Sequence, residues 1–148
     1  MMKQKLFILV FLMLVMTADC QQTVSFEELP QKMAIGPRPI VIKIYTDWCG
    51  ICKLQDRQLA KNEEVKKLLS EKYYYLELNA ETRKTLPFAG RAYKFIANGT
   101  GGINTLAAEL CQSQSYPCWV FLSPDYKVIS SYNGLLKPEQ LITILAKP

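Results

Sequence analysis

The chain of 148 residues is long enough for one domain with a buried core, and its apolar content of 49% indicates a globular body rather than a disordered one. The formal net charge is +5, but lysine and arginine are scattered along the chain instead of gathered in a stripe, so we expect no nucleic-acid partner. Histidine is absent, which removes the usual general base and the usual zinc or copper ligand.

Residues 1–20 have the pattern of a secretory signal peptide. Two lysines precede an unbroken apolar run (residues 6–16), and small side chains follow up to Cys20. The run is shorter than the roughly 20 residues that a membrane-spanning helix needs. We favour cleavage after Cys20, which predicts an exported, periplasmic protein. An uncleaved anchor stays open, as does a lipid anchor on Cys20 that would hold the chain at a membrane, although Asp19 is an unusual neighbour for a lipidated cysteine.

The first half of the remaining chain predicts an extension, a strand and two helices. Residues 21–38 form an N-terminal extension that is polar and interrupted by prolines, with at most one helical turn near its middle. The β-branched run 40–45 predicts a buried strand, and the composition of 50–60 predicts a helix. Asn62 has the character of an N-cap for a second helix, because acidic residues follow it at once.

The second half predicts a mixed sheet with an insertion. Alternating side chains predict a strand over 73–79, with Tyr74, Leu76 and Leu78 on one face. A hairpin around Ala89-Gly90 and a loop over 98–102 form an insertion near 82–102. The last expected elements are a short helix, two strands and a final helix starting at Pro138: residues 103–110, 119–122, 128–132 and 138–145. This order predicts an α/β fold whose mixed central sheet has helices on both faces.

The number and spacing of the cysteines limit the possible functions of the chain. If Cys20 leaves with the signal peptide, four cysteines remain, and two structural disulfides are the plainest interpretation for an exported chain. A domain of this size does not need such cross-links, however. Cys49 and Cys52 in particular would close a very short loop, which restricts the unfolded chain little. Their spacing therefore favours a reactive dithiol.

The segment around these two cysteines resembles a known family. Residues 45–53 (Tyr-Thr-Asp-Trp-Cys-Gly-Ile-Cys-Lys) resemble the active-site segment of the thioredoxin superfamily, above all bacterial exported thioredoxin-like proteins and the soluble thioredoxin domains of thiol–disulfide interchange proteins. Zinc knuckles share the C-x-x-C spacing, but Trp48 before it, Gly50 within it, a strand upstream and a helix downstream make the match specific. The resemblance implies a thioredoxin fold for a domain over residues 39–148.

The resemblance also implies a mechanism. Cys49 is expected at a helix N-terminus, where free N–H groups and the helix dipole favour the thiolate that acts in disulfide exchange. It would attack a substrate disulfide, and Cys52, one turn later, would release the reduced substrate. Trp48 would cover one side of the site. The expected partners are disulfide-containing exported proteins and a membrane thiol–disulfide interchange reductant, and the redox-active disulfide is the only cofactor expected.

A second segment resembles the family's cis-proline loop. Tyr116-Pro117 precedes an apolar strand, and the resemblance implies that Pro117 faces the dithiol while Tyr116 offers its backbone edge to an extended substrate. Cys118 stands where the family more often has threonine, and Cys111 lies seven residues earlier. Two interpretations stay open for this second pair. The favoured one is two small buried residues, and the other is an auxiliary redox pair.

Two positions depart from the family pattern. The family often has a buried acid six residues before the first active-site cysteine, where this chain has Lys43. We expect Lys43 to point to solvent, with burial beside the dithiol as the alternative. Ile51 replaces the proline of the thioredoxin pattern, and no histidine separates the cysteines as in strongly oxidising members. The latter feature favours a disulfide reductase.

Two functions of other classes compete with the oxidoreductase. One is a soft-metal protein on the same fold that binds or delivers copper or zinc, which would require thiolates from all four remaining cysteines to converge. The other is an exported binding module whose dithiol is vestigial. We expect no metal site.

Overall fold

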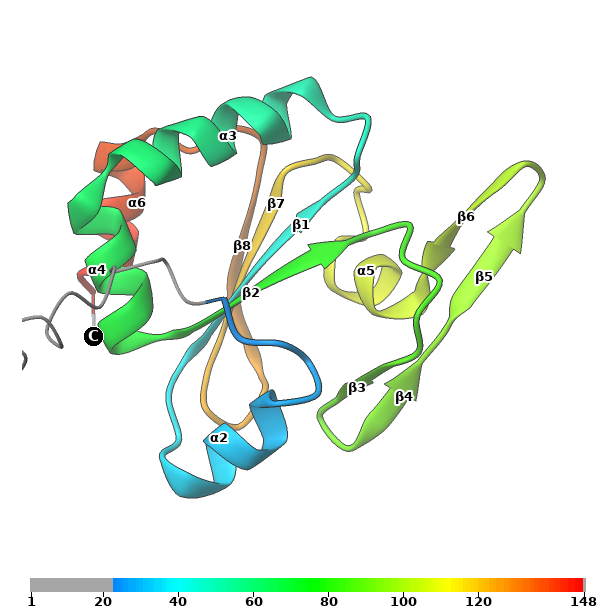
Figure 1. The fold of residues 1–148 in the computed structure, drawn as a ribbon, viewed down its shortest axis with the longest axis horizontal. Helices are drawn as coiled ribbons and strands as arrows, with labels where there is room; N and C mark the ends of the chain where they lie inside the picture. The colour runs from blue at the N-terminus through cyan, green and yellow to red at the C-terminus, as the bar shows by residue number, and fades with distance from the viewer. Residues whose placement is uncertain (1–22, 148) are drawn as a thin grey trace, which may run out of the picture.

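A computed structural model describes residues 23–147, so the predicted signal peptide and Cys20 lie outside the described residues. Its centre is a four-stranded sheet in the order β2-β1-β7-β8 (Figure 1). The four strands are β1 (Ile40–Tyr45), β2 (Tyr74–Asn79), β7 (Cys118–Leu122) and β8 (Val128–Asn133). β1 runs parallel to β2 and antiparallel to β7, and β7 runs antiparallel to β8. The predicted mixed sheet is confirmed.

Helices cover both faces of the sheet, as predicted (Figure 1). The helices are α2 (Leu29–Ile35), α3 (Gly50–Lys61), α4 (Glu63–Lys72), α5 (Thr105–Leu110) and α6 (Pro138–Leu145). Apolar side chains of α3, α4 and α6 pack with Tyr75 and Trp119 on one face. Those of α2 and α5 pack with Ile42, Leu76 and Val120 on the other. Both faces of β1 are therefore covered, which explains its continuous apolar run. Within residues 23–147 no helix has the length and apolar character to cross a bilayer.

Two predicted helix starts are confirmed by their caps. The Asn62 side chain accepts a hydrogen bond from the Val65 N–H at 2.9 Å, which closes the first turn of α4. Pro138 stands in the first turn of α6, where a missing N–H costs nothing. The prediction for the N-terminal extension was wrong, because α2 is a seven-residue helix rather than a single turn. Pro30 falls in the first turn of α2, where proline is tolerated, so it does not interrupt the helix.

The insertion contains two hairpins instead of the predicted hairpin and loop. The first joins β3 (Leu86–Phe88) to β4 (Arg91–Tyr93) through Ala89-Gly90, as predicted. The second pairs β5 (Phe95–Asn98) with β6 (Gly101–Asn104). The turn between β5 and β6 contains Gly99 with a positive φ of 60°, a conformation that glycine adopts readily. Both hairpins lie near α5 (Figure 1), and apolar side chains of the first hairpin pack in the cluster on the α2 and α5 face of the sheet.

A buried glutamine ties α3 to the segment that leads into α6. The Gln55 side chain donates to the Leu136 carbonyl at 3.0 Å and accepts from the Leu136 N–H at 2.9 Å. Gln55 is fully buried, so these bonds satisfy backbone groups that water cannot reach. On the same helix, Gln58 has a buried side-chain oxygen for which the described residues offer no partner.

Substitutions at these two glutamines test how much the Gln55–Leu136 hydrogen bonds contribute to stability. Gln55→Leu is expected to lower the free energy of unfolding by roughly 2–4 kcal/mol, because it leaves two buried backbone groups unpaired. Gln58→Leu removes an oxygen without a partner and is expected to change stability little or to raise it. Urea denaturation of both variants measures the difference. Equal losses would show that the Gln55 hydrogen bonds contribute nothing specific.

Candidate active site

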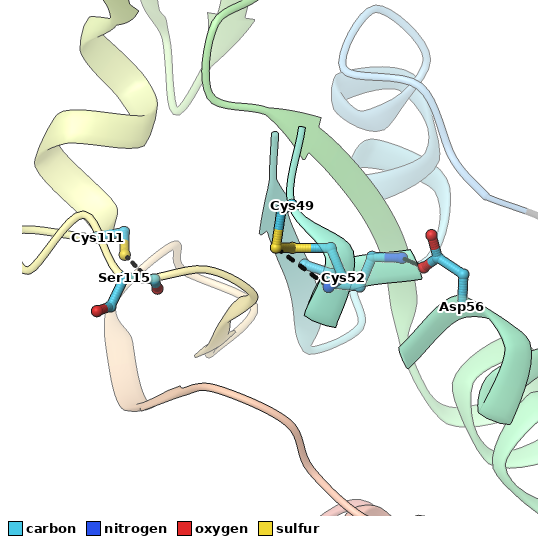
Figure 2. Close-up of a disulfide and its surroundings, with 6 residues drawn as sticks. Cys49, Cys52, Asp56, Cys111 and Ser115 are labelled. Carbon is cyan, nitrogen blue, oxygen red and sulfur yellow. Dashed lines mark hydrogen bonds and ion pairs between the residues drawn. A yellow bond between two sulfur atoms is a disulfide. The ribbon is translucent and has the colours of Figure 1, made fainter. Parts of the chain in front are cut away.

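Cys49 and Cys52 form a disulfide at the start of α3, with Cα atoms 5.3 Å apart (Figure 2). Cys49 is the N-cap of the helix, and its sulfur accepts a hydrogen bond from the Cys52 N–H at 3.1 Å. The Cys49 N–H in turn donates to the Thr46 carbonyl at 3.2 Å, in the turn that follows β1. Strand, turn and cap thus fix both sulfurs at the helix N-terminus.

This position favours a negative charge on the Cys49 sulfur once the disulfide is reduced. The N-terminal N–H groups of α3 have no carbonyl partner inside the helix, and one of them already points at the Cys49 sulfur. Cys49 is 6% exposed and Cys52 1% exposed, so Cys49 is the sulfur more open to an incoming disulfide. The geometry suits attack by Cys49 followed by resolution by Cys52.

Exposed apolar side chains surround the disulfide. Trp48 is 69% exposed and Ile51 is 50% exposed, although both adjoin a buried cysteine. The Trp48 ring N–H donates to Glu81 at 3.0 Å, and the ring meets Tyr116 edge-on with centroids 6.4 Å apart. A Cβ placed on Gly50 would meet nothing within 4 Å, so no contact within the described chain requires glycine there. Trp48 therefore belongs to the surface of the site and not to the core.

The contact between Trp48 and Tyr116 brings the second predicted segment to the site. The Tyr116–Pro117 peptide bond is cis, and the Pro117 carbonyl accepts from the Gly134 N–H at 2.7 Å. Among the described residues, neither the N–H nor the carbonyl of Tyr116 has a hydrogen-bond partner. Burial raises the pKa of the Tyr116 hydroxyl to about 12, and negative charge on the nearby Cys111 and Glu81 acts in the same direction.

The expectation that Lys43 points to solvent was wrong. Lys43 is 1% exposed and lies on the sheet face that α3 covers. Its ammonium group forms ion pairs with Asp56 of α3 and, at 2.6 Å, with Glu77 of β2. It also lies over the Tyr45 ring, 5.7 Å from the centroid. Helices cover both faces of β1, so Lys43 is buried, and its charge is matched by two carboxylates.

Asp56 and Glu77 are site residues that the sequence analysis missed. Asp56 follows Cys52 by four residues, one helical turn along α3 (Figure 2). Glu77 stands directly opposite Lys43 in the parallel pairing of β1 and β2. The two carboxylates thus connect the helix that begins at the disulfide to the strands beneath it. The pairing of β1 with β2 could have predicted Glu77, and the four-residue spacing from Cys52 along the helix could have predicted Asp56.

Cys111 and Cys118 are both buried and both free. They pack in the hydrophobic cluster on the α2 and α5 face of the sheet, so their burial is as predicted. Figure 2 shows Cys111 beside Ser115, apart from the Cys49–Cys52 disulfide. Within residues 23–147 no group of three or more cysteine, aspartate or glutamate side chains is arranged to hold a metal ion. Cys111 therefore lies apart from the disulfide.

A mixed four-stranded sheet with helices on both faces, and a C-x-x-C disulfide at the start of α3, define a thioredoxin-like protein. The chain belongs to the thioredoxin-like domain family, whose model matches residues 26–147. The expected superfamily is therefore confirmed. Family membership and the disulfide-linked pair together support thiol–disulfide oxidoreductase activity in general terms.

Solved structures show the same fold at low sequence identity. A thioredoxin-fold protein from Helicobacter pylori has 17% identity and a TM-score of 0.59 over 74% of this chain and 67% of its own. The DsbH oxidoreductase has 15% identity and a TM-score of 0.58 over 84% and 82%. A disulphide isomerase from Xylella fastidiosa has 14% identity and a TM-score of 0.53 over 86% and 92%. No curated protein matches the chain.

Proposed function

We propose that the protein is an exported disulfide reductase that acts on other exported proteins through Cys49 and Cys52. The observation that carries this proposal is the Cys49–Cys52 disulfide at the N-terminus of α3, with Cys49 as the helix cap. The apolar run at the chain's start supports export, because it follows two lysines and is too short to span a membrane comfortably.

The proposed cycle starts with both thiols reduced. The Cys49 thiolate attacks one sulfur of a substrate disulfide, and the other substrate sulfur leaves as a thiolate. Cys52 then loses its proton and attacks the Cys49 sulfur, which releases the second substrate thiol and restores the Cys49–Cys52 disulfide. Two electrons pass to the substrate. A reductant of the thiol–disulfide interchange class would return them, and we propose a membrane-bound one.

The surroundings of the disulfide suit an extended substrate. The unpaired backbone groups of Tyr116 lie beside Trp48, so a substrate strand can hydrogen-bond to Tyr116 while its cysteine reaches Cys49. The exposed side chains of Trp48 and Ile51 offer apolar contacts at the same place. Pro117 supports this edge from its buried position, with its carbonyl held by Gly134.

The residues between the cysteines support the proposed direction of reaction. Gly50 and Ile51 carry no charge and no hydrogen-bonding side chain, so nothing between the cysteines adds to the stabilisation of the Cys49 thiolate by the helix. Strong oxidants of this chemistry owe their power to an unusually stable reduced form. A site without such extra stabilisation suits a reductase.

A redox titration separates this proposal from its two rivals. The protein is equilibrated with glutathione at a series of ratios of reduced to oxidised form, and free thiols at Cys49 and Cys52 are counted by alkylation and mass spectrometry. A reductase is expected to show a reversible two-thiol transition, which the Cys49→Ser/Cys52→Ser variant lacks. Stoichiometric, tight copper or zinc binding by the reduced protein would support metal delivery instead. A disulfide that never exchanges would indicate a binding module.

A further inference from the structure

Cys111 and Cys118 lie side by side at one end of β7 and β8. Cys118 stands directly opposite Asn133 in the antiparallel pairing of these strands, so the two side chains share one face of the sheet. The Asn133 side-chain oxygen is 3.7 Å from the Cys111 sulfur. Asn133 therefore contacts one cysteine and flanks the other, which brings the two thiols together although no disulfide joins them.

The two cysteines pack in the hydrophobic cluster of this sheet face, but the Cys111 sulfur also has polar neighbours, and both cysteines border a cavity. Besides Asn133, the Cys111 sulfur lies 3.7 Å from the Ser113 hydroxyl and 3.7 Å from the Ser115 carbonyl (Figure 2). Both cysteines line a cavity of about 370 Å³, next to Ser113 and Asn133. Cys111 thus has hydrogen-bonding neighbours that a cysteine in a wholly apolar site would lack, and the cavity leaves room for a reagent beside both cysteines.

The two thiols differ in how readily each loses its proton. The neighbouring Cys118 thiol is the main cause that lowers the pKa of Cys111 to about 6, and the Ser113 hydroxyl and the backbone of Ser115 and Gln114 lower it further. The same neighbour, together with burial, raises the pKa of Cys118. The lower pKa makes Cys111 the thiol of the pair that more readily forms a thiolate, the form that attacks disulfides.

We propose that Cys111 and Cys118 are a second redox-active pair, which reacts with small disulfides that enter the adjoining cavity. The Cys111 thiolate attacks a low-molecular-weight disulfide such as oxidised glutathione, and one glutathione leaves as a thiolate. Cys118 then loses its proton and attacks the Cys111 sulfur, which expels the second glutathione. Two electrons pass from the pair to the small disulfide, and the new bond closes residues 112–117, with Tyr116 and Pro117, into a covalent loop.

The Cys111–Cys118 pair is tested in a variant that lacks both cysteines of the first site. The full chain with Cys49→Ser and Cys52→Ser is equilibrated under native conditions at a series of ratios of reduced to oxidised glutathione. It is then alkylated and mapped by mass spectrometry. The proposal expects a Cys111–Cys118 linked peptide whose share rises as glutathione becomes more oxidised and falls again on reversal. Adding Cys118→Ser is expected to leave glutathione attached to Cys111, because the resolving thiol is missing.

Three results would overturn the proposal. The first is alkylation of both thiols at every glutathione ratio. The second is a linked peptide that appears only after the protein is unfolded. The third is a bond from either cysteine to Cys20 instead of between the two. None of these results bears on disulfide exchange at Cys49 and Cys52, because both are absent from the variant tested.

Discussion

Replacing both Asp56 and Glu77 by alanine is expected to lower the free energy of unfolding by about 3–5 kcal/mol. The reason is Lys43, which is 1% exposed and whose ammonium group pairs only with these two carboxylates among the described residues. The double variant would leave a positive charge buried between β1 and α3 without a counterion, which costs far more than losing a surface ion pair. Urea denaturation of wild type and variant measures the loss.

A second variant separates the effect of the Lys43 charge from the effect of its packing. Lys43→Met alone keeps the volume of the side chain and is expected to cost less than about 1.5 kcal/mol, because the two carboxylates are partly exposed and can be hydrated. Adding Lys43→Met to the Asp56→Ala/Glu77→Ala variant is expected to recover most of the lost stability. No recovery in this triple variant would show that the carboxylates stabilise the fold in another way.

Replacing Cys49 by serine is expected to reduce the rate of insulin reduction to the rate that dithiothreitol gives alone. Serine keeps the size of the side chain and caps α3 equally well, but its hydroxyl cannot exchange with a disulfide. Cys52→Ser is also expected to stop turnover, because the mixed disulfide with the substrate is no longer resolved from within the site. Insulin turbidity in the presence of dithiothreitol measures both rates.

Cys111→Ser is the matched comparison, since Cys111 lies away from the Cys49–Cys52 disulfide and the second pair is proposed to react with small disulfides and not with insulin. It is expected to keep the wild-type rate of insulin reduction. If Cys49→Ser reduced insulin as fast as the wild type, Cys49 could not be the nucleophile. If Cys111→Ser lost as much activity as Cys49→Ser, a catalytic role for Cys111 would have to replace the one proposed here.

The sequence predicts those parts of the site that lie close together along the chain. Cys49 falls between a β-branched run and a helical segment, so its place as the cap of α3 follows from local pattern alone. Tyr116 and Pro117 are distant in sequence, and only the resemblance to thioredoxins connects them with Cys49. Their contact with Trp48 depends on the folding of the whole sheet.

The burial of Lys43 could not be predicted from the local sequence pattern. Alternation along β1 places Lys43 on one face or the other, but it cannot tell that both faces of this strand are covered by helices. That coverage depends on where helices distant in sequence pack, and the pairing of β1 with β2 sets Glu77 opposite Lys43. The hairpin of β5 and β6 was missed for a different reason. Its Asn98-Gly99 turn is a recognised hairpin signal, but the two glycines that begin β6 have low strand propensity.

Trapping the covalent intermediate tests the central claim most directly. The Cys52→Ser variant, reduced and then mixed with a peptide that contains a disulfide, is expected to form a mixed disulfide with the peptide at Cys49, visible by non-reducing mass spectrometry and reversed by dithiothreitol. Cys49→Ser, treated in the same way, is expected to form no adduct at Cys52, which is the more buried of the two sulfurs. An adduct at Cys52 in the second variant, or none at Cys49 in the first, would contradict the proposed mechanism.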